Sequence, residues 1–320
     1  MHGWIILDKP LELGSTQGVS AVKRALRQGG YRKLKVGHGG TLDPLATGVL
    51  PIAIGEATKL AGRMLDSDKV YDFTVAFGVE TDTLDLEGKA VAESDVRPSM
   101  MAIDAVLPQF TGAIDQVPPA YSALKVDGER AYDLARAGED VELKCRSVTV
   151  YSLVRHPRES GGLSPVLSNA RHGDEMGPRF RGDDEVMDSV TLTAHVSKGT
   201  YIRSLARDIA RALGTVGHVT YLRRIKAGPF DLSHAISLDK LDEAAKGRTL
   251  EQHLLPLRAG LDDIPALALD PDQAGALRQG RVLAGIAEDD GLHFATLGDT
   301  PVALVVVTSG EARVVRGFNL

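Results

Sequence analysis

Apolar positions along the chain follow the spacings of both strands and helices. The run Trp4–Leu7 is uninterrupted and stops at Asp8, Lys9 and Pro10, which predicts a short buried strand. Apolar and polar residues alternate in Val70–Phe77 and again in Val190–Val196, and this period of two predicts two half-buried strands.

Two other segments carry apolar stripes at helical spacing. The first stripe predicts a helix that Ser15 or Thr16 caps and that Gly29-Gly30 ends, with Val19, Val22, Ala25 and Leu26 facing inward. The second follows Lys198-Gly199-Thr200 and ends at Gly214, with Ile202, Leu205, Ile209 and Leu213 facing inward. Met101–Phe110 is predicted to form a further helix.

The second half of the chain contains a segment of unusual composition and, further on, an expected domain boundary. Residues 156–187 are rich in Gly, Pro and charge and poor in large apolar side chains, which predicts a disordered insertion between two neighbouring strands. A domain boundary is expected near 256–263. Beyond it, a helix over Pro271–Gln279 and a strongly β-forming run at Val302–Thr308 predict a small β-rich domain.

The chain has 320 residues, of which 43% are hydrophobic and 25% are charged, as in an ordinary globular protein. No segment has the pattern of a signal peptide or a membrane-spanning helix, so the expected location is the cytoplasm. The single cysteine, Cys145, excludes an internal disulfide and is predicted to be buried in a strand over 143–150.

The net charge of −6 hides two basic segments. Residues 1–42 carry a net charge of +5 and residues 197–228 a net charge of +6. If folding brings these segments together, they form the kind of surface that binds a polyanion. The alternative is that both are solvated helix faces.

The segment Gly37–Gly48 has the most unusual composition, with four glycines and one proline in twelve residues. Such a loop is tight, and its backbone can approach a ligand closely. It lacks the spacing of a phosphate-binding loop or a dinucleotide-binding motif. It presents one carboxylate, Asp43, beside His38. In an arbitrary protein, an Asp before Pro is most often a turn residue.

Five collinear segments resemble the TruB-type pseudouridine synthases. They are Leu7-Asp8-Lys9-Pro10, Gly37–Gly48, Lys69-Val70-Tyr71 with Phe77-Gly78, Val117–Lys125, and Gly199–Arg203 with Tyr221-Leu222-Arg223-Arg224. The resemblance spans about residues 3–230. From Leu267 onward the chain is similar, more loosely, to the PUA-like domain of these enzymes. Gly39 departs from the Thr expected after His38.

The resemblance implies an isomerase that converts uridine 55 in the T loop of tRNA to pseudouridine, without a cofactor or a metal. Asp43 would be the nucleophile, as carboxylates are in glycosidases, and Arg203 would keep it ionised. Tyr71 would stack on the base and take part in proton transfer. Tyr201 and Leu222 would line the uracil pocket, and His38 would fill the space left by the flipped base. Attack at C1′ and attack at C6 both remain open.

Several basic side chains are candidates for contact with the RNA backbone, although each alone is more often a plain surface charge: Lys9, Lys23, Arg24, Arg207, Arg223 and Arg224. Asp82, Asp85 and Glu87 lack the spacing of a calcium loop and are expected to form an acidic hairpin turn.

The predicted fold is therefore α+β. Residues 1–255 would form a catalytic domain with a mixed, largely antiparallel sheet and flanking helices, and residues 262–320 a PUA-like RNA-binding β domain. The protein would act as a monomer on tRNA, with no guide RNA and no membrane association. The competing interpretation is a non-catalytic RNA-binding protein or tRNA-folding chaperone.

Overall fold

The structure is a computed structural model that describes residues 1–122, 124–126, 128–139, 143–156 and 186–320. The chain forms two compact units. The first comprises Met1–Lys69 together with Arg223–Leu320, and the second comprises Val70–Leu222. Strand β12 (Gly217–Ala227) runs through the junction, so its first half belongs to the second unit and its second half to the first.

The first unit is built on strands in the order β14-β1-β3-β12. Strand β1 pairs antiparallel with β3 from Gly3 opposite Ile54 to Lys9 opposite Gly48. Residues Trp4–Leu7 are at most 1% exposed, as the uninterrupted apolar run predicts for a strand covered on both faces. The strands of this part are β1 (Gly3–Lys9), β2 (Val36–His38), β3 (Thr47–Ile54), β13 (Phe230–Asp231), β14 (Ala235–Ile236) and β15 (Leu255–Pro256).

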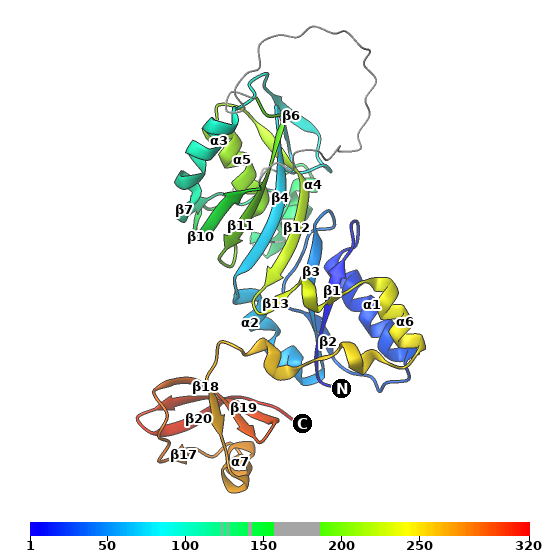
Figure 1. The fold of residues 1–320 in the computed structure, drawn as a ribbon, viewed down its shortest axis with the longest axis vertical. Helices are drawn as coiled ribbons and strands as arrows, with labels where there is room; N and C mark the ends of the chain where they lie inside the picture. Colours follow the sequence, from blue (N-terminus) through cyan, green and yellow to red (C-terminus); the bar gives the residue numbers. More distant parts are fainter. Residues whose placement is uncertain (123, 127, 140–142, 157–185) are drawn as a thin grey trace. The chain divides into compact units, whose positions relative to one another are not determined.

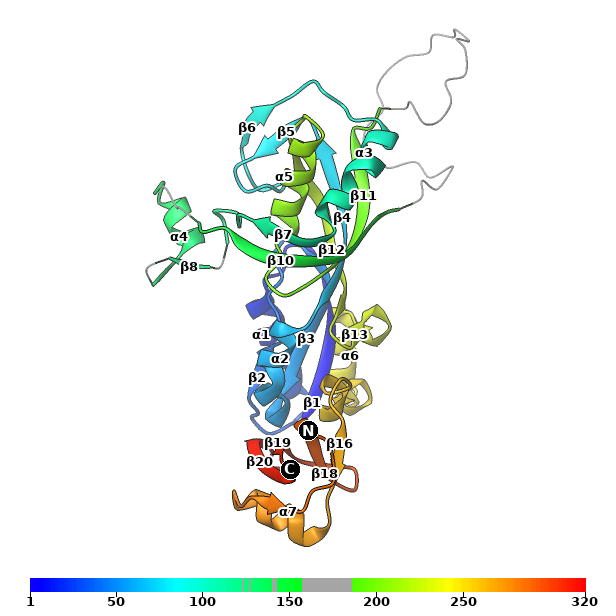
Figure 2. The ribbon, with the colours of Figure 1, turned by 90° about the vertical axis from the view of Figure 1, so that its left-hand side faces the viewer.

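Helices α1 and α6 lie side by side in this unit (Figures 1 and 2). The predicted stripe of α1 is confirmed, since Val19, Val22, Ala25 and Leu26 are buried. The helices are α1 (Ser15–Gln28), α2 (Ala61–Asp66) and α6 (Leu238–Lys246), with the short 3₁₀ helices η1 (Gly55–Leu60), η3 (Leu232–His234), η4 (Leu250–His253) and η5 (Leu257–Gly260).

The predicted cap of α1 is wrong. The N-cap is Gly14, whose backbone N–H donates to the side chain of Gln17 at 2.7 Å. Ser15 is the first helical residue, so its hydroxyl is available for a contact outside the helix.

A small β domain with its own core ends the chain, as predicted. Its strands follow the order β16-β18-β19-β20-β17. Asp270 caps helix α7 by accepting from the backbone N–H of Gln273, and Pro271 occupies the first turn. The elements are β16 (Ala266–Ala268), α7 (Pro271–Arg278), β17 (Leu283–Ala284), β18 (Gly291–Leu297), β19 (Thr300–Thr308) and β20 (Glu311–Gly317).

The second unit contains strands in the order β12-β4-β11-β10-β7. Helices α3 and α5 share one core with this sheet, because Ile103 of α3 and Leu205 of α5 belong to the same buried cluster as Phe73 of β4 (Figures 1 and 2). The strands are β4 (Lys69–Phe77), β5 (Val79–Thr81), β6 (Ala90–Glu93), β7 (Gly112–Gln116), β8 (Lys125–Val126), β9 (Glu129–Arg130), β10 (Arg146–Arg155) and β11 (Ser189–Val196). The helices are α3 (Met100–Val106), η2 (Leu107–Phe110), α4 (Ala131–Arg136) and α5 (Ile202–Ala212).

The predicted α+β class, with a mixed and largely antiparallel sheet, is confirmed. The acidic segment 82–89 joins the antiparallel strands β5 and β6, so the hairpin turn is also confirmed. Cys145 is a correction: it is exposed and precedes β10 instead of lying buried within a strand. The predicted insertion at 156–187 lies almost wholly outside the described residues.

Candidate functional site

The backbone around Asp43 is held by polar groups from three other segments. Ser15 Oγ donates to the carbonyl of Leu42 at 2.9 Å and accepts from the N–H of Leu42 at 2.8 Å. Both residues are buried. The loop is therefore fixed to the first turn of α1 immediately before the carboxylate.

Arg224 of β12 holds the glycine side of the same loop. Its guanidinium donates to the carbonyls of Gly40 and Thr41, each at 3.3 Å, and to that of Val49 at 2.8 Å. Strand β12 approaches so closely that a Cβ at Gly48 (φ +98°) would lie 2.2 Å from the Arg224 carbonyl oxygen. Only glycine fits at position 48 without moving this strand pair.

Lys9, at the end of β1, holds the proline side. Its Nζ donates to the carbonyls of Pro10 at 3.0 Å, Leu13 at 2.6 Å and Pro44 at 3.1 Å. Burial lowers the pKa of Lys9 to about 8; Asp43 opposes this shift and Arg224 adds to it. The carboxylate and the two cations are thus close enough to influence one another.

The main-chain carbonyls of residues 40–44 all accept hydrogen bonds. Arg224 serves Gly40 and Thr41, Ser15 serves Leu42, and the Ala46 N–H serves Asp43 at 3.0 Å. Pro44 accepts from Lys9 and from the Glu12 N–H at 2.9 Å. Asp43 itself is half-buried at the centre of this loop. A carboxylate on such a backbone is positioned before any substrate arrives.

Two predicted phosphate contacts are corrected by these interactions. Lys9 is 0% exposed and Arg224 is 1% exposed, so neither presents its charge at the surface. Their cationic groups point inward, where they donate to six backbone carbonyls. They stabilise the loop instead of offering a surface contact to RNA.

His38 ends β2 and stands beside the loop. Its Nδ1 accepts from the Gly40 N–H at 3.4 Å. Burial lowers the pKa of His38 from its ordinary value, and the charge of Arg224 lowers it further. Both effects favour the neutral form of the imidazole, which suits contact with an uncharged base.

In the second unit, Tyr201 is the N-cap of α5 and is fixed through its backbone. Its N–H donates to Gln116 Oε1 at 2.8 Å, and its carbonyl accepts from Gln116 Nε2 at 3.1 Å. The guanidinium of Arg146 lies over the Tyr201 ring at 4.7 Å from the centroid. Tyr71 and Leu222 are partly buried and pack against the core of this unit. Nothing in the sequence indicates that Gln116 holds Tyr201, because Gln116 becomes fully buried, with 0% of its surface exposed, only in the tertiary fold.

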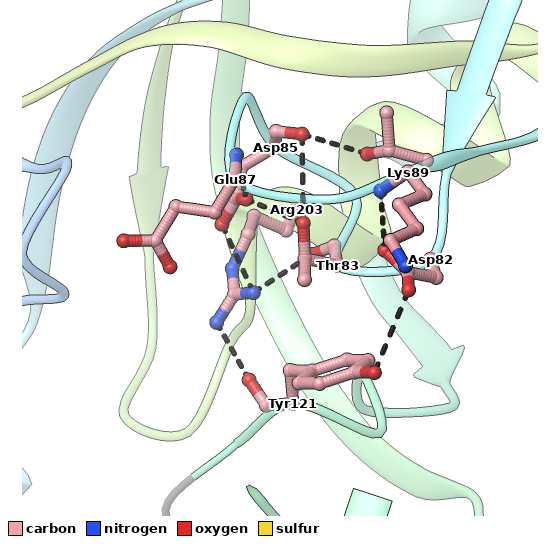
Figure 3. A network of polar contacts seen from close by, with 8 residues as sticks. Asp82, Thr83, Asp85, Glu87, Lys89, Tyr121 and Arg203 are labelled. Atoms are coloured by element: carbon pink, nitrogen blue, oxygen red, sulfur yellow. Dashed lines mark hydrogen bonds and ion pairs between the residues drawn. The ribbon is translucent and has the colours of Figure 1, made fainter. Parts of the chain in front are cut away.

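Arg203 lies in a buried polar network (Figure 3). It forms an ion pair with Asp85 at 3.2 Å and donates to the carbonyls of Thr83 at 2.8 Å and Tyr121 at 2.9 Å. Asp85 also accepts from Thr83 Oγ1 at 2.6 Å and from the Glu87 N–H at 3.0 Å. The sequence placed Asp85 only in an acidic turn, whereas in the structure it is the buried ion-pair partner of Arg203.

The other basic candidates differ in accessibility. Lys23 and Arg24 are exposed on α1. Arg207 forms an ion pair with Asp208 at 2.8 Å and donates to the Val117 carbonyl at 3.2 Å. Arg223 forms an ion pair with Asp8 at 2.9 Å. Lys23 and Arg24 are thus the candidates that best fit a surface contact.

The structure groups the predicted residues into two sets. The first unit contains the loop with His38 and Asp43, together with the residues that hold it, Lys9 and Arg224. The second unit contains Tyr71, Tyr201, Arg203 and Leu222. The resemblance assigns both sets to the same reaction, and this assignment stays a prediction. In the described part of the chain, no group of three or more His, Cys, Asp or Glu side chains could hold a metal ion. Among the helices described, none is long and apolar enough to cross a membrane.

Comparison with known proteins identifies the class. Residues 24–160 match the N-terminal domain model of the TruB family of pseudouridylate synthases. Residues 203–262 match the C-terminal domain model of tRNA pseudouridylate synthase B. Both models describe enzymes that isomerise uridine in RNA. The chain belongs to the TruB family of pseudouridine synthases, and it is therefore an isomerase.

Relatives match over the full length. The tRNA pseudouridine synthase B of Novosphingobium aromaticivorans is 64% identical over 100% of this chain and 98% of its own. The tRNA pseudouridine synthase B of Zymomonas mobilis is 57% identical over 100% and 96%, and that of Caulobacter vibrioides 44% identical over 100% and 97%.

Solved structures share the fold. A chain in an H/ACA RNP bound to a substrate RNA containing 2′-deoxyuridine has a TM-score of 0.69 and 24% identity, covering 99% of this chain and 85% of its own. A chain in the archaeal box H/ACA sRNP Nop10-Cbf5 complex has a TM-score of 0.66 and 22% identity, covering 99% and 86%.

The Asp85 contacts predict a stability effect. Asp85→Asn keeps the shape of the side chain but removes the charge that faces Arg203, so we expect the free energy of unfolding to fall by about 2 kcal/mol. Urea unfolding measures the change, and Glu87→Gln, in the same turn but exposed, is the matched control. Equal stability of the Asp85 variant and the control would contradict the role given to this ion pair.

Lys9 predicts a pH dependence. Its pKa is about 8 in the folded protein and about 10.4 when unfolded, so the unfolded chain binds more protons between these values. The contribution of Lys9 to stability therefore rises as pH increases from about 8 to about 10.4. Carbon-13 NMR of the lysine Cε should show a midpoint near pH 8 for Lys9, assigned by its loss in Lys9→Met. Exposed Lys23 is the reference, and a Lys9 midpoint above pH 10 would contradict the assignment.

Proposed function

We propose that this enzyme converts uridine 55 in the T loop of tRNA to pseudouridine, acting as a monomer in the cytoplasm without a guide RNA or a cofactor. The full-length relatives, each a tRNA pseudouridine synthase B, support tRNA as the substrate. Position 55 is the site that the TruB-type motifs imply. The observation that carries the proposal is Asp43 on a loop whose carbonyls 40–44 all accept hydrogen bonds.

The chemistry needs a nucleophile but no redox step. The bond from C1′ to N1 breaks, the uracil turns, and C1′ joins C5. C5 then loses a proton and N1 gains one, so the product is an isomer of the substrate. Asp43 would capture either C1′ of the sugar or C6 of the base while the glycosidic bond is broken. Arg203 would keep the carboxylate ionised, and the phenol of Tyr71 would help to move the C5 proton.

The base must leave the folded T loop to reach such a site, which costs a few kcal/mol. Neutral His38 would stack in the space that the uridine vacates. Tyr71 and Tyr201 offer aromatic faces and Leu222 an apolar wall for the extruded uracil. The backbone contacts of Tyr201 with Gln116 support this role, because they fix the main chain from which the ring projects.

The alternative of a non-catalytic RNA chaperone is not favoured. RNA binding alone requires no ionisable carboxylate on a fixed loop. A guide-dependent enzyme is likewise not favoured. The solved structures that contain H/ACA assemblies are 22–24% identical to this chain. The relatives at 44–64% identity are each named tRNA pseudouridine synthase B, and these names mention no guide RNA.

The C-terminal β domain differs from the basic segments in charge. Residues 262–320 contain four arginines and nine carboxylate side chains, a net charge of −5. Its Phe294 and Phe318 belong to the same core cluster as Trp4, and Lys59 Nζ donates to the Gly317 carbonyl at 2.8 Å. We therefore propose that this domain braces the N-terminal strands and that phosphate contacts come mainly from the basic segments.

Replacement of the nucleophile is the first test. Asp43→Asn preserves shape but removes the negative charge, so the rate of pseudouridine formation should fall by on the order of 1,000-fold or more, with tRNA affinity within about three-fold of wild type. Chemical mapping of pseudouridine on unmodified tRNA measures the site and the rate. Exposed Asp95→Asn is the control. Near-normal turnover by the Asp43 variant would overturn the proposed chemistry.

The distribution of charge predicts which arginines and lysines bind RNA. The double variant Lys23→Ala/Arg24→Ala should weaken tRNA binding and lower the slope of log K against log salt concentration by about 1 to 2, because two phosphate contacts are lost. Arg278→Ala/Arg281→Ala removes two exposed charges from the C-terminal domain and should leave the slope unchanged. The reverse pattern in a filter-binding titration would assign the phosphate contacts to the C-terminal domain.

A further inference from the structure

Ser15 contacts the catalytic loop in a way that its sequence position does not suggest. The residue opens α1 and is only 5% exposed. Because Gly14 caps the helix and its own N–H is bonded to Gln17, Ser15 Oγ is not used in capping. Instead, this one hydroxyl serves both polar groups of the Leu42 main chain, at 2.8 and 2.9 Å.

The position of Leu42 gives these bonds a consequence for Asp43. Leu42 is the residue directly before the proposed nucleophile and is itself 4% exposed. Water therefore has little access to replace the hydroxyl, and the Leu42 main chain would lose two partners at once. The direction of the Asp43 side chain depends on the peptide that joins it to Leu42. Holding the Leu42 main chain thus holds the backbone of Asp43, from which the carboxylate projects.

Helix α1 makes Ser15 a rigid point of attachment. The buried stripe of α1 packs in the first unit, where Gly18 lies against Leu7 of β1 and Leu50 of β3. A Cβ at Gly18 would lie 3.1–3.2 Å from these two side chains, so the helix sits close to the sheet. Ser15 links the loop to this packed layer through uncharged hydrogen bonds, whereas Lys9 and Arg224 hold neighbouring carbonyls with buried charges.

We propose that Ser15 is a positioning residue for pseudouridine formation: its hydroxyl holds the Leu42 peptide so that the Asp43 carboxylate meets the uridine at reacting distance. The inference rests on the proposed role of Asp43 as the nucleophile. Ser15 does not touch the substrate in this account and acts only through the loop. Its loss should therefore slow the chemical step without weakening the binding of RNA.

The test is single-turnover kinetics of Ser15→Ala at saturating tRNA. We expect the rate to fall by about 10- to 100-fold, since a displacement of about 1 Å of a reacting group can cost that much, while the Kd for tRNA stays within about two-fold of wild type. The rate is compared at a temperature where circular dichroism shows every variant to be fully folded. This split between rate and affinity separates positioning from a general loss of structure.

Two variants complete the design. Thr215→Val is the matched control, because Thr215 is 5% exposed and its hydroxyl donates to the Val96 carbonyl at 2.9 Å, within the second unit. It loses a buried hydroxyl and should keep the wild-type rate. Asp43→Asn is assayed in parallel.

The outcomes are distinguishable. An inactive Asp43→Asn together with a Ser15→Ala rate within about two-fold of wild type would overturn the role of Ser15 alone. An active Asp43→Asn would overturn the proposed function itself. A slow Ser15→Ala whose loss of rate is matched by Thr215→Val, or is explained by weaker tRNA binding, would also overturn the inference.

Discussion

The structure of the catalytic loop depends on buried hydrogen bonds to its own main chain. A segment rich in glycine has little intrinsic preference for one conformation, and its entropy favours disorder. Here the carbonyls of residues 40–44 all have donors, supplied by β1, α1, β12 and the loop itself. The glycines allow the close approach of other chain segments, and the donors select one arrangement. Asp43 is consequently the end point of a network that begins in the packed strands and helix.

Two of these donors are buried cations, and this has an electrostatic consequence. An isolated charge in the protein interior is strongly destabilising unless polar groups replace the lost water. Backbone carbonyls do so for Lys9 and Arg224, and the lowered pKa of Lys9 shows that the compensation is incomplete. The charge of Arg224 also adds to the effect of burial in lowering the pKa of the neighbouring His38. Arg224 therefore contributes both to the shape of the loop and to the electrostatics beside it.

Local patterns in the sequence were sufficient to predict much of the fold. The alternation in Val70–Phe77 and the stripes of α1 and α5 are confirmed, because each reflects packing against one face. The α+β class and the membership of the TruB family are confirmed as well. The spacing of apolar residues within one strand or helix shows which of its faces is buried.

The errors concern contacts between residues far apart in the chain. Ser15 is a residue type that often caps helices, yet its partner lies 27 residues away. Lys9 and Arg224 are residue types that are usually exposed, but both are buried against the loop. Asp85 lies in a turn, where an aspartate is usually solvated, but it pairs with Arg203. Each case depends on which segments the tertiary fold brings together, and no local periodicity reports that.

Hydrogen exchange at the Leu42 amide tests the central claim, that the loop is fixed before RNA binds. In the RNA-free enzyme, NMR should find this amide protected to nearly the same extent as core amides of β1 and β3, because its N–H is buried and bonded to Ser15. Exchange at the rate of an unstructured peptide would show that the loop opens freely, and it would contradict a carboxylate positioned in advance.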